Sequence, residues 1–211
     1  MQKIIIELIN KIAEVINTNK DYLTDLDRTI GDGDHGVNLN RGFSKIKEDA
    51  GGYSNLSDSE ISNKIAMTLI SNVGGASGAL YGTAFMKMAI FLKGKENISK
   101  NDIPDIISVG IEGIKMRGKS DVQEKTMLDT LVPFSNYLKK NIQKEEKLNI
   151  IFSEALIKAK EGRDSTIDML AKKGRASYLK ERSIGHLDPG AASSYLILET
   201  ITDVLRGKDI W

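Results

Sequence analysis

The amino-acid sequence predicts an all-α protein, and two observations support this prediction. Apolar residues recur at spacings of three and four along almost the whole chain, which is typical of helices with one buried face. Strict apolar–polar alternation is nowhere sustained, and only three prolines occur. With 211 residues, 40% of them hydrophobic, the chain can bury one core of ordinary size. We therefore expect one all-α domain over residues 1–211.

The apolar stripes define about eight helices in chain order. The first stripe begins in "KIIIEL", where a short strand is the alternative, but the helical spacing continues for three more turns and favours a helix. Shorter helices are expected from about Tyr22 to Ile30 and from near Gly36. The other stripes are Ile61–Val73, Leu80–Phe91, Ile103–Ile114, Leu128–Leu138, Leu148–Leu156 and Tyr195–Leu205. Breaks are expected near 18–21, 31–35, 50–57, 74–78, 94–102, 118–125, 143–147 and 173–188.

Composition excludes several classes of function. With 30 basic and 29 acidic side chains, the net charge of +1 offers no field that would attract nucleic acid or an anionic membrane. Cysteine is absent, which excludes disulfides, thiolate catalysis and cysteine-ligated zinc. The N-terminal segment is amphipathic and unlike a secretory signal, and no apolar run is long enough to span a bilayer. We therefore expect a cytoplasmic protein.

Three carboxylates crowd into one turn in "LDRTIGDGDHGVN", residues 26–38. If the helix ends at Ile30 with Gly31 in the left-handed conformation, Asp27 lies in its last turn, where the helix dipole disfavours a carboxylate. Gly33 permits a tight turn that directs Asp32 and Asp34 toward Asp27. Such a cluster needs a cation to neutralise it, and its hard oxygen ligands suit Mg²⁺, Ca²⁺ or Mn²⁺.

A solvated turn in which Asp34 caps the next helix is the alternative interpretation of this cluster. An EF-hand is excluded, because the glutamate that it requires eleven residues after Asp32 is replaced by Phe43. His35 alone is weak evidence for a ligand, since a lone histidine is more often structural.

Two further segments have the features of anion-binding helix starts. "NVGGASGALYG", residues 72–82, exposes amide groups before a helix expected near Ala79, although a close helix–helix contact would explain the same glycines. "HLDPGAASS", residues 186–194, is another helix start, with Asp188 at the N-cap and Pro189 at the first helical position, and it needs no ligand to explain it. Mg²⁺ usually shares its ligand shell with phosphates. A combined site for metal and phosphate would form if these segments and the acidic turn meet at one end of a helical bundle.

"GIKMRGKS", residues 113–120, matches the Walker A string, but its context is wrong for a P-loop. A P-loop follows a buried strand and begins a helix in a parallel sheet, whereas residues 103–114 have helical spacing. No apolar strand ending in a metal-binding aspartate is present either. We therefore reject the P-loop interpretation.

Four ordered motifs resemble the nucleotide-binding L subunits of dihydroxyacetone kinases. They are "LDRTIGDGDHGVNLNRGF", "GGASGALYG", "RGKSDVQEKTMLDTL" and "GRASYLKERSIGHLDPGAASS". The resemblance implies an antiparallel eight-helix barrel with a nucleotide, ADP or ATP, at one rim. It also implies that Asp27, Asp32 and Asp34 bind two Mg²⁺ ions that bridge the phosphates. The positions that match phosphate contacts are His35, Gly36, Val37, Asn38, Ala76, Ser77 and Gly78. Those around the adenosine and phosphates are Gly118, Met127, Arg175, Asp188, Pro189 and Gly190.

The chain departs from the family pattern at three positions. Gln123 and Lys180 replace residues that are commonly glycine, and Leu187 replaces one that is commonly polar. These differences leave the three aspartates unchanged but could alter the adenosine wall or the rim that faces a partner.

The resemblance also implies partners and a reaction. Dihydroxyacetone would sit on a separate K subunit, and a phosphohistidine on an M subunit would recharge bound ADP, with phosphoenolpyruvate as the ultimate donor. The chain is not fused to a K domain, which favours this phosphotransferase-system branch, and a homodimer is possible. Three alternatives remain: an ATP-exchanging triose or ketose kinase subunit, a non-catalytic nucleotide-dependent regulatory module, and the nucleotide-binding domain of a fatty acid kinase.

Overall fold

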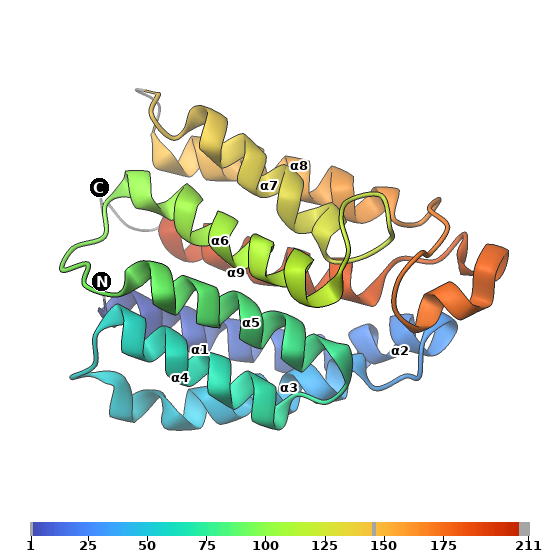
Figure 1. Ribbon diagram of the computed structural model, residues 1–211, viewed down its shortest axis with the longest axis horizontal. Coiled ribbons are helices and arrows are strands. Elements are labelled where there is room, and N and C mark those ends of the chain that lie inside the picture. The colour runs from blue at the N-terminus through green and yellow to red at the C-terminus, as the bar shows by residue number, and fades with distance from the viewer. Residues whose placement is uncertain (1, 145–146, 207–211) are drawn as a thin grey trace.

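The computed structural model describes residues 2–144 and 147–206, and within them the protein is entirely helical (Figure 1). No strand occurs in these ranges. The α-helices are α1 (Gln2–Thr18), α2 (Lys20–Ile30), α3 (His35–Asp49), α4 (Asp58–Asn72), α5 (Gly75–Leu92), α6 (Ile103–Gly118), α7 (Leu128–Asn141), α8 (Leu148–Ser165) and α9 (Pro189–Arg206). Three 3₁₀ segments join them: η1 (Ala50–Tyr53), η2 (Lys100–Asp102) and η3 (Arg175–Ser183).

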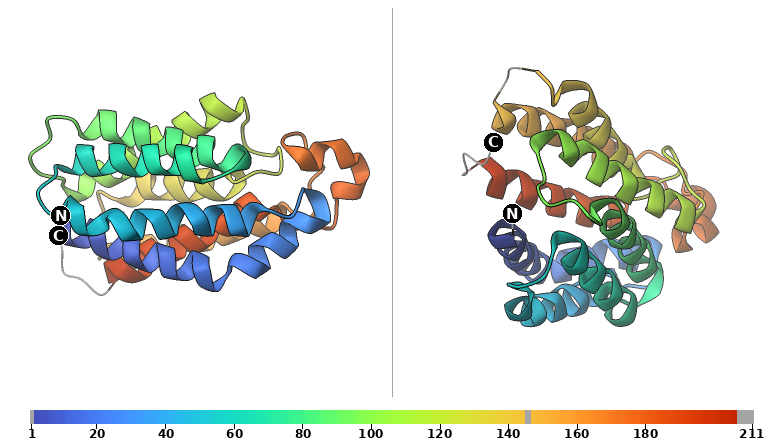
Figure 2. Two further views of the ribbon diagram at one scale, coloured as in Figure 1. Left: turned by 90° about the horizontal axis from the view of Figure 1, so that it is seen from below. Right: turned by 60° about the vertical axis from the view of Figure 1, so that its left-hand side comes forward.

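Eight of these helices form a closed ring, which confirms the expected helical barrel. Each helix in the series α1, α3, α4, α5, α6, α7, α8, α9 packs against the next, and α9 packs back against α1. The short helix α2 lies outside this series at one end, where it contacts α3, α9 and η3. In Figure 2, η3 and α2 lie at one end of the long helices, opposite the start of α1.

Two buried apolar clusters fill the ring. The larger cluster joins α1, α3, α4, α5, α6 and α9, with Ile16, Leu39 and Leu69 fully buried in it. The smaller cluster lies between α7, α8 and α9, where Phe134 and Phe152 meet edge to face with ring centroids 6.0 Å apart. A third cluster, Ile30, Ala171 and Ala176, attaches the segment that contains η3 to the end of α2. Apolar burial therefore stabilises the packing of the η3 segment on α2 as well as the barrel itself.

Most expected helix boundaries are correct to within two residues, and "KIIIEL" is helical. Three details were wrong. The helix expected near Ala79 begins at Gly75, and α8 ends at Ser165, several residues before the break expected at 173–188. Gly31 is extended, with φ −139°, and the left-handed residue of this turn is Gly33, with φ 72°. Part of the break expected at 143–147 lies outside the described residues.

Residues 113–120 confirm that the Walker A match is fortuitous. Gly113 and Gly118 belong to α6, and Lys119 ends that helix in the left-handed conformation, with φ 47°. The match therefore lies at a helix C-terminus, where carbonyl groups point outward, whereas a P-loop presents the amides of a helix N-terminus. In addition, no helix in the described part of the chain combines the length and apolar character needed to cross a membrane.

The two positions where glycine is common in the resembling family have positive φ angles here. Gln123 has φ 64°, and Lys180 has φ 50° with ψ −129°, which interrupts η3 with a kink. An L-residue at such angles is strained, whereas glycine is not. Glycine would therefore relieve a strain that this chain tolerates at both positions.

We predict that Lys180→Gly raises the free energy of unfolding by about 1 kcal/mol, because it removes strain at a sparsely populated backbone conformation. Urea unfolding monitored by circular dichroism would measure the change. Lys160→Gly, in the interior of α8, is the control and should lower stability by about 1 kcal/mol. Loss of stability in Lys180→Gly would contradict the prediction.

Candidate functional site

The acidic turn between α2 and α3 brings three carboxylates together. One oxygen atom each from Asp27, Asp32 and Asp34 lies within 4.8 Å of the others. Asp27 is only 8% exposed, whereas Asp32 is open to solvent. The left-handed Gly33 permits this turn, and a Cβ there would lie 2.6 Å from Cγ of Arg28. The predicted convergence of the three side chains is therefore present in the structure.

The Asp27 carboxylate caps helix α3. Its Oδ2 accepts hydrogen bonds from the backbone N–H groups of Asp34 (2.9 Å) and His35 (3.2 Å). These are two of the amide groups that a helix leaves unpaired at its start. Asp34 occupies the N-cap position of α3, as the alternative expected, but its side chain makes no capping hydrogen bond, and Asp27 accepts the amides instead. The cap leaves the other oxygen of Asp27 available for a ligand.

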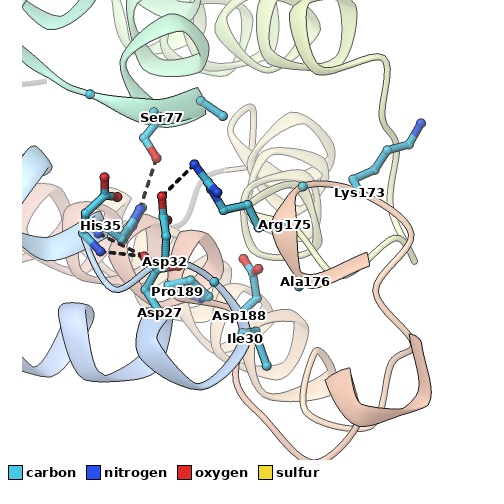
Figure 3. Close-up of a pocket in the computed structure, with 16 residues that line it drawn as sticks. Asp27, Ile30, Asp32, His35, Ser77, Lys173, Arg175, Ala176, Asp188 and Pro189 are labelled. Carbon is cyan, nitrogen blue, oxygen red and sulfur yellow. Dashed lines mark hydrogen bonds and ion pairs between the residues drawn. The ribbon is translucent and has the colours of Figure 1, made fainter. Parts of the chain in front are cut away.

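Arg175 reaches the acidic turn from η3. Its guanidinium lies 2.8 Å from Oδ2 of Asp32, in a partly exposed ion pair that Figure 3 shows across the pocket. An exposed pair of this kind contributes little to stability. Its significance is geometric, because the guanidinium places a positive charge beside the carboxylates, where an anion could also enter.

His35 connects the starts of three helices. Its Nδ1 lies 3.1 Å from Oγ of Ser77 on α5, and its Nε2 lies 3.0 Å from Oγ of Ser193 on α9. Ser193 also contacts the Tyr81 hydroxyl at 3.2 Å, and that hydroxyl lies 2.9 Å from Oγ of Ser194. Burial lowers the pKa of the His35 imidazole, against the opposing effect of the Asp27 and Asp34 carboxylates. His35 is therefore a buried, neutral link between helix N-termini.

The glycines of this region allow close packing of backbones. A Cβ at Gly36 would lie 1.9 Å from the carbonyl oxygen of Lys20, and one at Gly78 would lie 2.2 Å from that of Val73. The packing explanation thus holds for Gly78. Gly75 differs, since it has φ 66° and nothing lies within 4 Å of its Cβ position, so it faces open space. At this turn the backbone bends away from its neighbours and exposes its amides.

Two adjoining cavities meet at these helix starts. The smaller, of about 140 Å³, is lined by the three aspartates, the 74–77 turn, Arg175 and Pro189. The larger, of about 570 Å³, extends toward the end of α6 and the start of α7. His35, Ser77, Asp188 and Pro189 line both cavities. One continuous site therefore has an acidic compartment and a roomier one beside it.

Apolar side chains form a wall of the larger cavity. Leu80, Ile114 and Met127 line it, together with Gly118 and Gly190. An apolar wall of this kind suits the face of a nucleobase, and the polar end beside it suits phosphates. Chemically, the site can hold a divalent cation on hard oxygen ligands and an anion on the amides of helix starts.

Most of the site residues expected from the sequence line these cavities, and a few do not. Gly36, Asn38 and Gly78 are buried behind the site, and Val37 is exposed beside it. Asn38 instead accepts a hydrogen bond from Arg41 (2.9 Å) and supports the turn at Gly74.

Several residues that line the cavities were not predicted from the sequence. Lys173 and Gly174 line both cavities, while Leu80, Ile114, Arg117 and Lys125 line the larger one. Helical periodicity could have identified Leu80 and Ile114, because they lie on apolar stripes that end at this rim. Lys173 and Lys125 lie in irregular segments, where spacing carries no such signal.

Asp188 is a buried carboxyl group at the start of α9. Its Oδ2 accepts a hydrogen bond from the Ala191 backbone N–H (2.7 Å), which confirms the predicted N-cap. Burial raises the pKa of Asp188 to about 7, although that hydrogen bond and the Lys125 ammonium favour the charged form. This carboxyl group therefore changes charge near neutral pH, inside both cavities.

Comparison with known proteins gives consistent results. The DAK2 domain family model matches residues 29–203. An ADP-binding subunit of a PTS-dependent dihydroxyacetone kinase from Lactococcus lactis is 45% identical over 202 residues, covering 95% of this chain and 96% of its own. The corresponding subunit of a PEP-dependent kinase from Escherichia coli is 38% identical, covering 93% of this chain and 94% of its own. The crystal structure of the C. freundii dihydroxyacetone kinase with AMP-PNP and Mg²⁺ shares the fold, with a TM-score of 0.73 and 20% identity, over 94% of this chain and 33% of that one.

We predict that Asp188→Asn stabilises the protein increasingly as pH rises from 5 to 8. The unfolded chain releases the Asp188 proton near the ordinary pKa of 3.8, whereas the folded protein holds it until about pH 7. The stability provided by the neutral carboxyl group is thus lost as pH rises through this range. The difference between variant and parent in free energy of unfolding should grow by about 2 kcal/mol, because asparagine has no proton to lose.

Urea unfolding at several pH values, with a chelator and without nucleotide, would test this prediction. Asp105→Asn, at an exposed position in the first turn of α6, is the matched control for loss of one carboxylate. An equal pH-dependent gain in the control variant would contradict an effect specific to Asp188.

Proposed function

Because this chain belongs to the DAK2 domain family, we propose that it is the nucleotide-binding subunit of a phosphoenolpyruvate-dependent dihydroxyacetone kinase. The observation that supports this proposal is the convergence of Asp27, Asp32 and Asp34 with the turn at Ser77, beside an apolar cavity. Relatives at 45% and 38% identity over nearly their full length are named as ADP-binding subunits of such kinases.

In this proposal, the three aspartates hold Mg²⁺, and the resemblance puts the number of ions at two. The donor set fits this cation, because it consists of hard carboxylate oxygens and lacks sulfur. Bound Mg²⁺ supplies charge neutralisation for the β- and γ-phosphates of a nucleotide. Asp27 is suited to this role, since its hydrogen bonds from Asp34 and His35 fix one oxygen and orient the other.

The remaining residues would bind and orient the nucleotide. Ser77 and the amides near Gly75 would receive phosphate oxygens at the start of α5, with His35 fixing the serine. Leu80, Ile114 and Met127 would contact the base in the larger cavity. Arg175 would exchange its bond with Asp32 for one with phosphate and so stabilise negative charge on the transferring group. Little acid–base chemistry is required of this chain.

The phosphoryl acceptor would then be dihydroxyacetone on a separate K subunit that meets the nucleotide rim. Bound ADP would be recharged in place by a phosphohistidine on an M subunit. An ATP-exchanging kinase subunit would need the same site but would release ADP freely. Retention of ADP therefore distinguishes a subunit whose ADP is recharged by phosphohistidine from one that exchanges ADP for ATP.

We predict that the protein, purified without added nucleotide, carries ADP that survives dialysis, and that Asp32→Asn loses both ADP and phosphoryl transfer. Loss of one carboxylate should weaken Mg²⁺ binding at least tenfold, because it removes a charged ligand. Native mass spectrometry measures bound ADP, and a coupled assay with K and M subunits measures transfer.

Asp25→Asn, at an exposed position on α2, the helix that precedes the acidic turn, is the control and should retain ADP and activity. Intact ADP retention with full activity in Asp32→Asn would refute the proposed role of the acidic turn. Parent protein that exchanges ADP on dialysis and turns over with ATP would instead indicate the ATP-exchanging alternative.

A further inference from the structure

Lys125 is a buried lysine with no assigned role. Only 1% of its surface is exposed, and it is the largest side chain buried to this degree in the described residues. It lies in the loop of residues 119–127 between α6 and α7, with φ 60°. A lysine is almost never fully buried unless its ammonium group is paired.

The Lys125 ammonium group binds backbone carbonyl groups from two places in the chain. It donates hydrogen bonds to the carbonyls of Thr166, Ile167 (3.4 Å) and His186 (2.5 Å). Thr166 and Ile167 directly follow α8, and His186 lies just before α9. We call the chain between them, residues 166–186, the cap segment. Lys125 therefore joins the two ends of the cap segment at one point.

The cap segment carries residues of the proposed nucleotide site. Lys173, Gly174 and Arg175 lie within it and line the cavities, and Figure 3 shows Lys173 and Arg175 on this segment beside the pocket. Its two ends also meet directly, where the Gly185 N–H donates to the Ile167 carbonyl at 2.8 Å. The position of Arg175 therefore depends on how the base of this segment is held.

Further contacts join the loop 119–127 to the cap segment. The backbone N–H of Lys172 donates to the carbonyl of Glu124 at 3.1 Å, and Nζ of Lys173 donates to the carbonyl of Lys119 at 2.5 Å. The same loop ends at Met127, in the wall of the larger cavity. The apolar wall and the cap segment are thus parts of one connected structure.

The arrangement is costly to disrupt. Burial lowers the pKa of Lys125, while the carboxylates of Asp188 and Asp129 favour its charged form. An apolar side chain of similar length would leave the carbonyl groups of Thr166, Ile167 and His186 without this donor. The Thr166 and Ile167 carbonyls would keep the backbone N–H groups of Met169 and Gly185, but loss of the buried Lys125 donor would still destabilise the structure locally. The base of the cap segment would then open more often.

We propose that Lys125 is a positioning residue that holds the cap segment over the bound nucleotide and thereby sets the rate at which the nucleotide leaves. This inference rests on the proposed function for its ligand. It assigns slow nucleotide release to a side chain that lines the larger cavity and joins the loop 119–127 to the cap segment there.

The test compares Lys125→Met with Lys119→Met, the same substitution at an exposed position in the same loop. Stopped-flow fluorescence with mant-ADP and Mg²⁺ measures nucleotide association and dissociation. We expect Lys125→Met to raise the dissociation rate at least tenfold with association changed less than twofold, and Lys119→Met to leave both unchanged. An unchanged dissociation rate in Lys125→Met, or an equal increase in Lys119→Met, would overturn the proposal.

Hydrogen exchange without nucleotide provides a readout that does not depend on the proposed ligand. In Lys125→Met, the amides of Lys172 and Gly185 should exchange at least tenfold faster, while those in the middle of α1 and α4 keep their parent rates. Uniform acceleration across all helices would show general destabilisation and would overturn a positioning role.

If Lys125→Met does not fold, the unaltered protein still tests the inference. The amides of Lys172 and Gly185 should then exchange through the same opening as protected amides of the loop 119–127, with the same dependence on denaturant. Independent opening of the cap segment would overturn the proposal. Failure of mant-ADP to bind parent protein from which retained ADP has first been removed would refute the proposed function instead, and the exchange result would still decide the role of Lys125.

Discussion

The hydrogen bonds from the Asp34 and His35 amides to the Asp27 carboxylate are the interaction on which the candidate site depends. A carboxylate in the last turn of α2 is unfavourable with respect to that helix, whose negative pole it adjoins. The same carboxylate is favourable at the start of α3, where it pairs with free amides. Its position thus fixes the angle between two helices, and the turn between them carries the other aspartates.

The closed ring explains why so many helix starts share one rim. The long helices alternate in direction around most of the barrel, so the starts of α3, α5, α7 and α9 lie at the end covered by α2 and η3 (Figures 1 and 2). Each start presents unpaired amides and a partial positive charge. The acidic turn lies among them, so both charge signs occur within one small cavity. An ion pair of metal and phosphate matches such a site better than either ion alone.

Periodicity and turn chemistry allowed the fold and the acidic turn to be predicted, because they depend on local sequence. Ile61, Ile65 and Leu69 define a buried stripe whatever lies opposite them, and all three belong to the buried core. The family resemblance, confirmed by comparison, is the basis for proposing that a nucleotide binds at this rim. Neither source identified Asp27 as the cap of α3, because that role depends on the angle between two helices.

The role of Lys125 was hidden from the sequence for a similar reason. Its carbonyl partners lie 41 to 61 residues away and carry no side-chain signature. The positive φ angles of Gln123 and Lys180 were equally hidden, although the family preference for glycine at both positions was a clue.

The two hydrogen bonds of His35, with Ser77 and with Ser193, must run in the same donor-to-acceptor direction through the imidazole. A neutral imidazole has one proton, so one ring nitrogen donates and the other accepts. When Nδ1 donates, Ser77 keeps its own hydroxyl proton free to point into the cavity, where it suits an anion. When Nδ1 accepts, the Ser77 hydroxyl donates its hydrogen bond to His35 and offers only oxygen lone pairs to the cavity, which suit a cation. The tautomer of one histidine thus determines which sign of ligand charge this serine recognises, and a bound ligand selects the tautomer in return.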